Sequence, residues 1–343
     1  MTMNLQESSR QLIERHRTLL KEEYSRILPP GCPYALVDFP DHSNVGDSAI
    51  WVGERRLLKA ITGRDPSYVS TIRSFDPDVV KKLPRDCPIL IHGGGNLGDL
   101  WIKHQEFREL LLMAGFNRPI VQLPQSIRFG DADRAKRFAD IVKGREDFTL
   151  LVRDRKSLTS AKDRLGISAR LVPDSAVGIG PRHEAKTPEY DAVMLLRTDH
   201  EGAIDDDCAN TVPQNTLARD WLEEPDDFAS RTFKDNRRHA LKKLRLGTQQ
   251  RRLMFYDLLA ERRVERGLAL LSKGRVTVTD RLHGHILSVL LGLPTVSLDN
   301  SYGKVSTYID AWTSDYAGLR RADDIPQAMQ ALPGLLSETS ASA

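Results

Sequence analysis

Two segments with the pattern Asn-x-Gly-Asp, residues 44–47 and 96–99, each follow a short apolar run, and three glycines precede the second. Asn and Gly tolerate the backbone of tight turns, and free backbone N–H groups attract anions. Because both segments would lie at the carboxyl ends of strands in one sheet, we expect them to form a ligand cleft. The residues expected to face this ligand are Asn44, Gly46, Gly94, Gly95 and Asn96.

The glycine-rich segment also matches the pattern G-x-G-x-x-G of dinucleotide-binding loops at Gly93, Gly95 and Gly98. Such a site needs an Asp or Glu about 20 residues further on, at the end of the next strand, to hold the ribose. The next apolar run, "PIVQLPQSI", carries glutamines but no acid. We therefore reject a dinucleotide and expect no cofactor.

Cationic side chains follow two apolar runs in the second half of the chain. Arg281 and His283 stand at a junction of strand and helix, and Lys304 follows the next strand beside Gly303. Each residue alone is typical of a solvated surface or a satisfied core histidine. Together at one sheet edge, and near a helix N-terminus, they indicate a site for a carboxylate or phosphate.

The composition excludes several classes of protein. The 343 residues are 40% hydrophobic and 28% charged, with a net charge of +3, which does not suit a protein that coats nucleic acid. Cys32, Cys87 and Cys208 are far apart, and His, Asp and Glu do not cluster, so we expect neither a disulfide framework nor a metal site. No apolar run approaches the ~20 residues that span a bilayer, so we expect a cytoplasmic protein.

Short apolar runs alternate with helical patterns, which predicts parallel sheets. Strands are expected at 34–39, 88–92, 119–123, 148–152, 169–172, 191–196, 275–280 and 294–299. Helices are expected at 5–28, 48–62, 103–115, 131–143, 155–165, 282–291 and, as the last one, from 304. This order predicts an α/β fold of two Rossmann-like, doubly wound domains that face a cleft.

The domain boundaries follow from composition. Residues 1–30 form a helix that packs on the first domain, and residues 31–183 form that domain. A polar segment with prolines at 181–190 is the expected linker to a second domain at 184–330, which carries the donor site. Residues 331–343 end in "SETSASA" and are expected to fray.

Six segments, taken in order, resemble the polysaccharide pyruvyl transferase family. They are "SNVGD", "HGGGNLGDLW", "LVRDRKS", "VPDSA", "TDRLHGHI" and "LDNSYGKVSTY", which together span roughly residues 34–312. The resemblance implies two Rossmann-like domains in the arrangement called GT-B. It also implies transfer of the enolpyruvyl group of phosphoenolpyruvate to hydroxyls of a saccharide, usually as a ketal, in exopolysaccharide or cell-wall polymer assembly.

The resemblance also implies roles for individual residues. Arg153, His283 and Lys304 match the donor-site residues of the family, and Arg281 matches the arginine of the same motif as His283. Ketal formation needs a proton at the methylene carbon of the donor, for which His283 is the best general acid. Asp47 is either a base for the saccharide hydroxyls or the N-cap of the helix at 48.

Three further polar residues lie beside the glycine-rich segments. We expect Asp99 to cap a helix, and His42 and His92 to be structural or to face the acceptor rather than to be catalytic.

The stretch 231–252 is rich in Lys and Arg, with one acid, and usually such a run is a solvated helix face. Few aromatic residues accompany it, which argues against nucleic acid. The resemblance implies a lipid-linked acceptor (an oligosaccharide on a lipid pyrophosphate), so the stretch leaves open a peripheral position on the inner face of the cytoplasmic membrane.

Two other functions stay open at this point. A GT-B glycosyltransferase with a nucleotide-sugar donor would share the architecture, and an anion-binding protein of the same fold would lack turnover. Residues from about 200 to 260 follow no pattern of the family, so the acceptor-binding residues cannot be named from the sequence.

Overall fold

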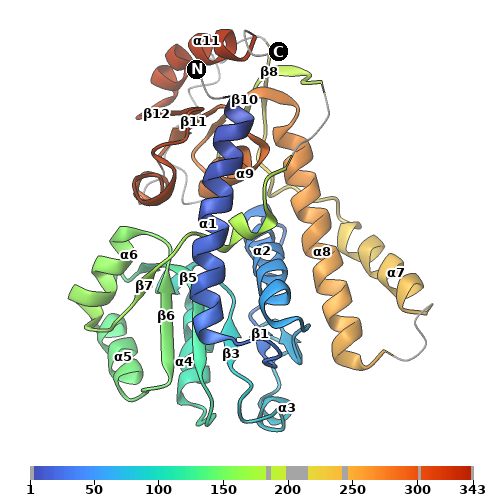
Figure 1. The fold of residues 1–343 in the computed structure, drawn as a ribbon, viewed down its shortest axis with the longest axis vertical. Helices are drawn as coiled ribbons and strands as arrows, with labels where there is room; N and C mark the ends of the chain where they lie inside the picture. Colours follow the sequence, from blue (N-terminus) through green and yellow to red (C-terminus); the bar gives the residue numbers. More distant parts are fainter. Residues whose placement is uncertain (1–3, 183–186, 198–214, 242–245, 300–302, 341–343) are drawn as a thin grey trace.

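The computed structural model describes residues 4–182, 187–197, 215–241, 246–299 and 303–340. Its strands form two parallel sheets, one in each half of the chain, with helices packed between and around them (Figure 1). This confirms the predicted α/β fold with two Rossmann-like domains.

The first sheet has the strand order β2-β1-β3-β5-β6-β7, and β4 pairs with β5 beyond the end of β3. Its strands are β1 (Ala35–Val37), β2 (Tyr68–Ser70), β3 (Ile89–Ile91), β4 (Gly94–Gly98), β5 (Ile120–Arg128), β6 (Phe148–Val152) and β7 (Arg170–Leu171). The helices of this half are α2 (Val45–Thr62), α3 (Pro77–Lys81), α4 (Ile102–Met113), α5 (Ala132–Lys143) and α6 (Arg155–Thr159), which continues as a π-helical turn over Ser160–Leu165.

The second sheet has the order β12-β11-β10-β8-β9. Its strands are β8 (Tyr190–Leu195), β9 (Thr216–Ala218), β10 (Gly274–Thr279), β11 (Thr295–Leu298) and β12 (Leu319–Ala322). The helices of this half are α7 (Phe228–Leu241), α8 (Thr248–Leu271), α9 (Leu282–Leu291), α10 (Lys304–Tyr308), a π-helical turn over Ile309–Thr313, and α11 (Ile325–Ser340).

Each sheet contains one point where the direction of strand addition reverses. In the first sheet it lies between β1 and β3, and in the second between β8 and β10. Ligands of doubly wound folds bind outside the carboxyl ends of the strands at such points. The residues that follow these four strands are therefore the first places to look for a site.

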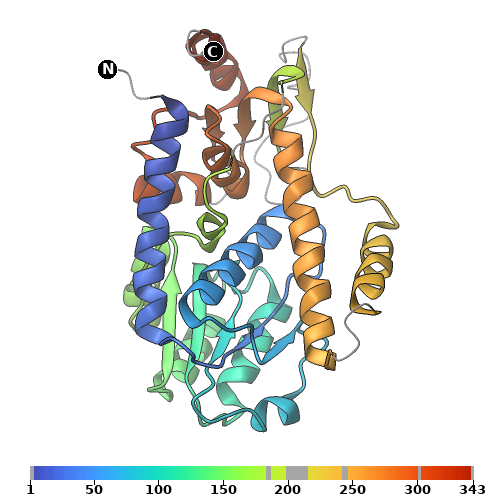
Figure 2. The ribbon, with the colours of Figure 1, turned by 45° about the vertical axis from the view of Figure 1, so that its right-hand side comes forward.

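One apolar core joins the two halves. It contains residues of α1 (Leu5–Ile27), α2, α8 and α9 together with residues that face inward from both sheets. In Figure 2, α1 and α8 run along two sides of the molecule with α2 between them. Trp51 Nε1 and Arg55 Nε of α2 both donate to Asp257 of α8, at 2.9 and 3.1 Å. The helices between the sheets therefore belong to both domains.

The N-terminal helix contacts both halves of the chain, and not only the first domain on which it was expected to pack. Helix α1 contacts α2 of the first half and α9 of the second. Gln6 Nε2 donates to the carbonyl of Leu291 at 2.9 Å, and Ser9 Oγ donates to the carbonyl of Val289. The apolar stripe of α1 is long enough to cover elements of both sheets, so the helix bridges them.

The C-terminal segment is more ordered than expected. A strand, β12, and a helix, α11, follow the helix expected to be the last. Leu332 and Leu335 of α11 are buried against the second sheet, so the prediction of a frayed tail from residue 331 is wrong up to residue 340. Residues 341–343 lie outside the described part, as do residues 183–186 of the expected linker.

The two Asn-x-Gly-Asp segments are not alike. Helix α2 begins at Val45, three residues earlier than predicted, so the first segment is a helix N-terminus with Asn44 as its N-cap. The second segment begins inside β4, which pairs with β5 through Gly94, Leu97 and Gly98. The prediction of two similar anion-facing loops is therefore wrong, although both segments lie at the same edge of the sheet.

Candidate functional site

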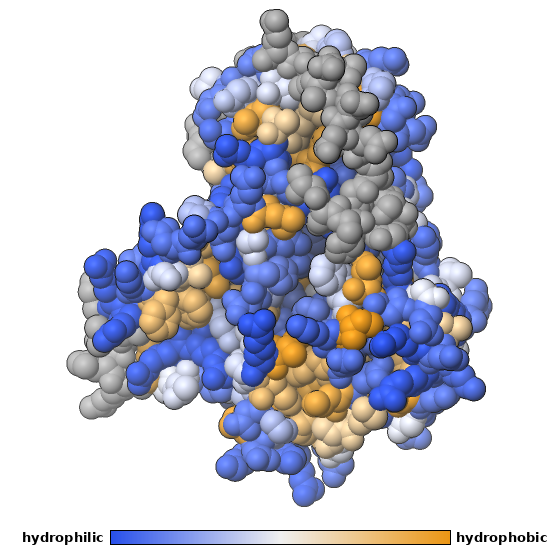
Figure 3. Space-filling view, turned by 180° about the vertical axis from the view of Figure 1, so that it is seen from behind, coloured by the Kyte–Doolittle hydropathy of each residue, from blue (hydrophilic) through white to orange (hydrophobic). Residues whose placement is uncertain are grey.

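A cavity of about 490 Å³ lies between the carboxyl ends of the two sheets. Seen from behind, the surface is hollowed between the two halves and mostly hydrophilic there (Figure 3). Of the ten residues predicted to form the site, eight line this cavity; Gly46 and Gly94 lie directly behind its wall. The eight are Asn44, Asp47, Gly95, Asn96, Arg153, Arg281, His283 and Lys304.

A buried carboxylate behind the cavity wall, Asp174, connects the two halves. Arg153, directly after β6, donates through Nη1 to Asp174 Oδ2 at 2.6 Å. His283, in the first turn of α9, places Nε2 3.3 Å from the same oxygen. Asp174 is fully buried, and its other oxygen accepts from the backbone N–H of Ala176 at 2.7 Å. The arginine and the histidine are thus held next to each other.

Burial alone would raise the pKa of Asp174, but the charges of His283 and Arg153, with hydrogen bonds from His283 and from the backbone of Ala176, outweigh it and hold the pKa far below its usual range. The carboxylate is therefore ionised at every working pH. Asp174 belongs to the segment "VPDSA", whose sequence predicts no role for it. Its role depends on a contact between residues 109 positions apart, which no spacing in the sequence indicates.

Two cations converge above Gly95. A methyl group at this position would lie 3.0 Å from Arg153 Nη2 and 3.5 Å from Lys304 Nζ. Arg153 Nε is bonded to Ser126 Oγ at 2.9 Å, and Nη1 to Asp174, so the direction of the guanidinium is fixed. Because glycine has no side chain, a small space remains at Gly95 between the positive charges of Arg153 and Lys304.

His283 lies against the N-terminus of α2. A methyl group at Gly46 would overlap His283 Nδ1, so the close approach requires glycine. The side chain of Asn44 accepts from the backbone N–H of Gly46 at 3.0 Å, which fixes this turn. Asp174 contacts Nε2, and Gly46 bounds the ring on the Nδ1 side, so His283 has one orientation.

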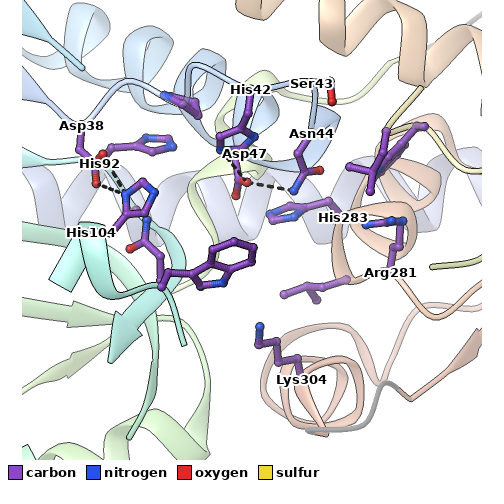
Figure 4. A pocket seen from close by; sticks show the side chains of 18 of the residues that line it. Asp38, His42, Ser43, Asn44, Asp47, His92, His104, Arg281, His283 and Lys304 are labelled. Carbon is purple, nitrogen blue, oxygen red and sulfur yellow. Dashed lines mark hydrogen bonds and ion pairs between the residues drawn. The ribbon is translucent and has the colours of Figure 1, made fainter. Parts of the chain in front are cut away.

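Asp47 lies in the first turn of α2 and is not its N-cap. Its Oδ2 accepts from Asn44 Nδ2 at 2.9 Å and lies 3.6 Å from His42 Nε2 (Figure 4). Burial raises its pKa, but His42, His283, His92 and Arg153 together lower the pKa below its usual range. Asp47 is therefore an anion close to His283 (Figure 4).

Arg281 has a different environment from the other cations. Its Nη2 donates to Asp220, and both side chains are almost completely buried. Part of its charge is thus compensated within the protein. Arg197, which follows β8 and was not predicted, also lines this side of the cavity.

Two histidine–carboxylate pairs form the wall at the switch point of the first sheet. His92 Nδ1 lies 2.7 Å from Glu54 Oε2. His104 Nδ1 lies 3.0 Å from both oxygens of Asp38 (Figure 4). Asp38 follows β1 and is the only non-glycine residue with positive φ (70°) in the described part of the chain. Such backbone strain is common at functional sites.

The remaining wall is aromatic and apolar. Trp101, at the start of α4, is 41% exposed and lines the cavity, as do Trp221 and Leu222. Tryptophan offers a flat apolar face and one polar edge. Sequence reasoning missed these residues because they follow β4 and β9, which were not predicted.

Asp99, expected to cap a helix, bonds elsewhere. It accepts from the backbone N–H groups of Gly130 and Asp131, at 2.9 and 2.6 Å, while α4 begins after Trp101. Within the described ranges, no three His, Cys, Asp or Glu residues are grouped as metal ligands.

The basic stretch 231–252 divides into α7 and the start of α8, with 242–245 outside the described residues. Helix α7 lies outside α8, away from the rest of the molecule (Figure 2). Its exposed face carries Arg231, Phe233, Lys234, Arg237 and Arg238. As far as the chain is described, no helix has the length and apolar character needed to cross a membrane.

Comparisons with known proteins agree with one another. The family model of polysaccharide pyruvyl transferases matches residues 44–302. The chain is 32% identical to Pyruvyl transferase 1 of Schizosaccharomyces pombe over 300 residues, which are 81% of this chain and 69% of that protein. It is 29% identical over 303 residues to "Putative pyruvyl transferase EpsO" of Bacillus subtilis, over 85% of this chain and 90% of that protein.

A solved structure shows the same fold. The crystal structure of an uncharacterized protein from Klebsiella pneumoniae has a TM-score of 0.58 to this chain, with 17% identity, over 90% of this chain and 98% of the other. At this identity the likeness extends to the fold alone.

Proposed function

Because the chain belongs to the polysaccharide pyruvyl transferase family, we propose that it transfers the enolpyruvyl group of phosphoenolpyruvate to hydroxyls of a saccharide in exopolysaccharide biosynthesis, forming a ketal. The observation that carries this proposal is the position of Arg153 and Lys304 above Gly95, with His283 on the same buried carboxylate as Arg153.

Phosphoenolpyruvate carries a phosphate and a carboxylate on three carbons, so its site needs several donors in a small volume. Arg153 Nη2 and Lys304 Nζ meet this need, since charge-assisted hydrogen bonds to phosphate and carboxylate are the strong ones. Arg197 and Arg281 also line the cavity, where Asp220 compensates part of the charge of Arg281.

In the proposed chemistry, His283 donates a proton to the methylene carbon of the donor. The central carbon becomes electron-poor and is attacked by a saccharide hydroxyl. Asp174 stabilises the charged imidazole and fixes the ring, as a buried acid does for a catalytic histidine. No step of this route needs a cofactor or a metal.

The acceptor is proposed to lie against the other wall. Trp101 presents an exposed aromatic face on which the C–H groups of a sugar ring pack well. Asp47 accepts a hydrogen bond from an acceptor hydroxyl in this arrangement, because its lowered pKa favours an anion that binds protons weakly.

A lipid-linked acceptor would require the protein to approach a membrane from the cytoplasmic side. The exposed face of α7 combines cations with Phe233, which is 54% exposed. Cations near an anionic leaflet contribute about 1 kcal/mol each. We propose α7 as the part of the basic stretch that contacts anionic headgroups.

The test is incubation with phosphoenolpyruvate and a panel of oligosaccharides, with phosphate release and the mass of the acceptor as readouts. We expect both products from the unaltered chain and thermal stabilisation by phosphoenolpyruvate but not by a nucleoside diphosphate. His283→Ala should lower kcat by about 10²–10⁴-fold and keep the stabilisation by the donor. A variant that retains most of its rate would remove His283 as the acid.

A further inference from the structure

The imidazole of His92 has one nitrogen, Nε2, that makes no hydrogen bond to the described part of the protein. His92 follows β3, and its side chain is 3% exposed. Its Nδ1 is bonded to Glu54 Oε2, but its Nε2 has no hydrogen-bond partner among the described residues, although it is buried. A buried polar atom without a partner costs about 1–3 kcal/mol. Since His92 lines the cavity, the missing partner is expected to be a ligand.

A second buried histidine provides the contrast. His285 Nε2 lies 2.8 Å from Thr313 Oγ1, and its Nδ1 lies 3.0 Å from Ser297 Oγ. Both nitrogens of this core residue are satisfied by the protein, whereas only one nitrogen of His92 is.

Glu54 holds His92 in position. This carboxylate is fully buried on α2, and its Oε1 also accepts from the backbone N–H of Gly93 at 2.9 Å. With Nδ1 of His92 donating to Glu54, the lone pair of the neutral imidazole lies on Nε2. The ring is thus oriented as a proton acceptor.

We propose that His92 Nε2 is the base that removes the proton from the attacking saccharide hydroxyl, with Glu54 as its positioning residue. This assignment rests on the proposed function. It places the acid, His283, on the second half of the chain and the base on the first, with the donor between them.

The surrounding charges support His92 over Asp47 as this base. Burial lowers the pKa of His92, but Glu54 of α2 outweighs it, and Asp38 at the end of β1 and Asp47 of α2 add to the rise above the ordinary value. His42, which precedes α2, also faces this group, and its own pKa is lowered, first by burial. The pKa of Asp47 is lowered instead, so its carboxylate removes protons poorly.

The transfer balances with these two groups. His283 gives a proton to the methylene carbon while the oxygen of the first hydroxyl bonds to the central carbon and its proton passes to His92. The bond from this carbon to the phosphate oxygen then breaks, and the phosphate leaves with the electron pair and takes the proton from His92. The second hydroxyl bonds to the same carbon, and its proton restores His283.

The experiment compares His92→Gln and Glu54→Gln with His16→Gln. His16 is a buried histidine of α1 that does not line the cavity. For each protein, kcat, the KM for phosphoenolpyruvate, the melting temperature and the pH profile of kcat are measured with the best acceptor from a panel of methyl hexopyranosides and oligosaccharides.

A base acts in its unprotonated form, so kcat of the unaltered chain should rise with pH through the raised pKa of His92. His92→Gln should lower kcat by about 10²–10⁴-fold, leave the donor KM within about threefold and abolish this rise. Glu54→Gln removes the main cause of the raised pKa, so it should shift the rise to lower pH. His16→Gln should keep the kcat and the profile.

Three results would overturn the inference. The first is a His92→Gln variant that retains kcat and the acid side of the profile. The second is a loss that appears in the donor KM, or in the melting temperature beyond that of His16→Gln, instead of in kcat. The third is an unaltered chain without any pyruvyl transfer, which overturns the proposed function as well; the first two leave that function standing.

Discussion

Arg153 and His283 contact the same oxygen atom, Oδ2 of Asp174, at 2.6 and 3.3 Å. Arg153 follows a strand of the first sheet, and His283 begins a helix that follows a strand of the second. The carboxylate lies on the segment between the two sheets, before a 3₁₀ turn (Ser175–Ile179). One buried anion therefore couples the orientation of a cation to that of a histidine.

Asp174→Asn should test whether Asp174 positions His283 for catalysis, as distinct from helping to bind the donor. The amide retains the shape of the side chain but not its charge, so the imidazolium of His283 loses its counter-ion. We expect kcat to fall by about 10²-fold or more while the chain stays folded at neutral pH. Steady-state kinetics with varied donor check this, and an unchanged kcat would contradict the role of Asp174.

The lowered pKa of Asp174 also predicts that its contribution to the free energy of unfolding depends on pH. Because the folded-state pKa of Asp174 is lowered, its contribution to the free energy of unfolding is complete above the unfolded value of about 3.9 and is lost as the pH falls toward the folded value. The difference between the unaltered chain and Asp174→Asn in urea unfolding should be fully present at about pH 5 and shrink below about 4. A difference that grows at low pH would have the wrong sign.

Gly46→Ala should displace His283, the proposed general acid, and affect binding of the donor less. Alanine suits the first turn of a helix, but its methyl group would overlap His283 Nδ1, so the ring must move. The methyl group would also lie 2.7 and 2.9 Å from Cγ and Cβ of His283, so α2 and α9 must shift as well. We expect kcat to fall at least tenfold and the melting temperature to fall, with a smaller change in the donor KM. A rate like that of the unaltered chain would show that His283 tolerates displacement.

Gly95→Ala should act on the donor instead. Its methyl group would occupy the space 3.0 Å from Arg153 Nη2 and 3.5 Å from Lys304 Nζ. We expect the KM for phosphoenolpyruvate to rise about tenfold or more, since a charge-assisted hydrogen bond contributes about 1.5–3 kcal/mol. Gly144→Ala, at the exposed end of α5, is the matched control and should leave the KM unchanged.

The exposed cations of α7 lead us to expect that the protein binds anionic vesicles. Replacing Arg231, Lys234 and Arg237 with Gln should lower the partition coefficient to phosphatidylserine vesicles by roughly 10²-fold, at about 1 kcal/mol per cation. Sedimentation at low and high salt measures this, and binding should weaken with salt.

The control for α7 replaces three exposed cations of α5, Arg134, Lys136 and Lys143, in the same way. This triple variant should bind like the unaltered chain. Equal losses in both variants would indicate that net charge, and not α7, causes the attraction.

The sequence was sufficient to predict the two parallel sheets, because strands with apolar runs alternate with amphipathic helices. It also predicted His283 and Lys304 at one sheet edge, since each follows a strand, whereas Arg153 was added only by the resemblance to the family; all three line the cavity. The short strands β2, β9 and β12 were missed, because three or four residues carry too little pattern to be distinguished from loops.

The pairs that orient the histidines were beyond prediction. Glu54 lies 38 positions before His92, and Asp174 lies 109 positions before His283. Both contacts depend on how α2 packs: a methyl group at Gly53 would overlap the carbonyl of Ser175, so glycine permits this close approach. Such packing between distant segments leaves no periodic signal in the sequence.

The apolar core that α1, α2, α8 and α9 share with both sheets also limits how the protein can move. Rotating one sheet away from the other would expose leucines and valines to water, at about 25 cal/mol for each Å². The shared core therefore holds the two walls of the cavity together, and under the proposed function an acceptor would enter between walls that a common set of helices already positions.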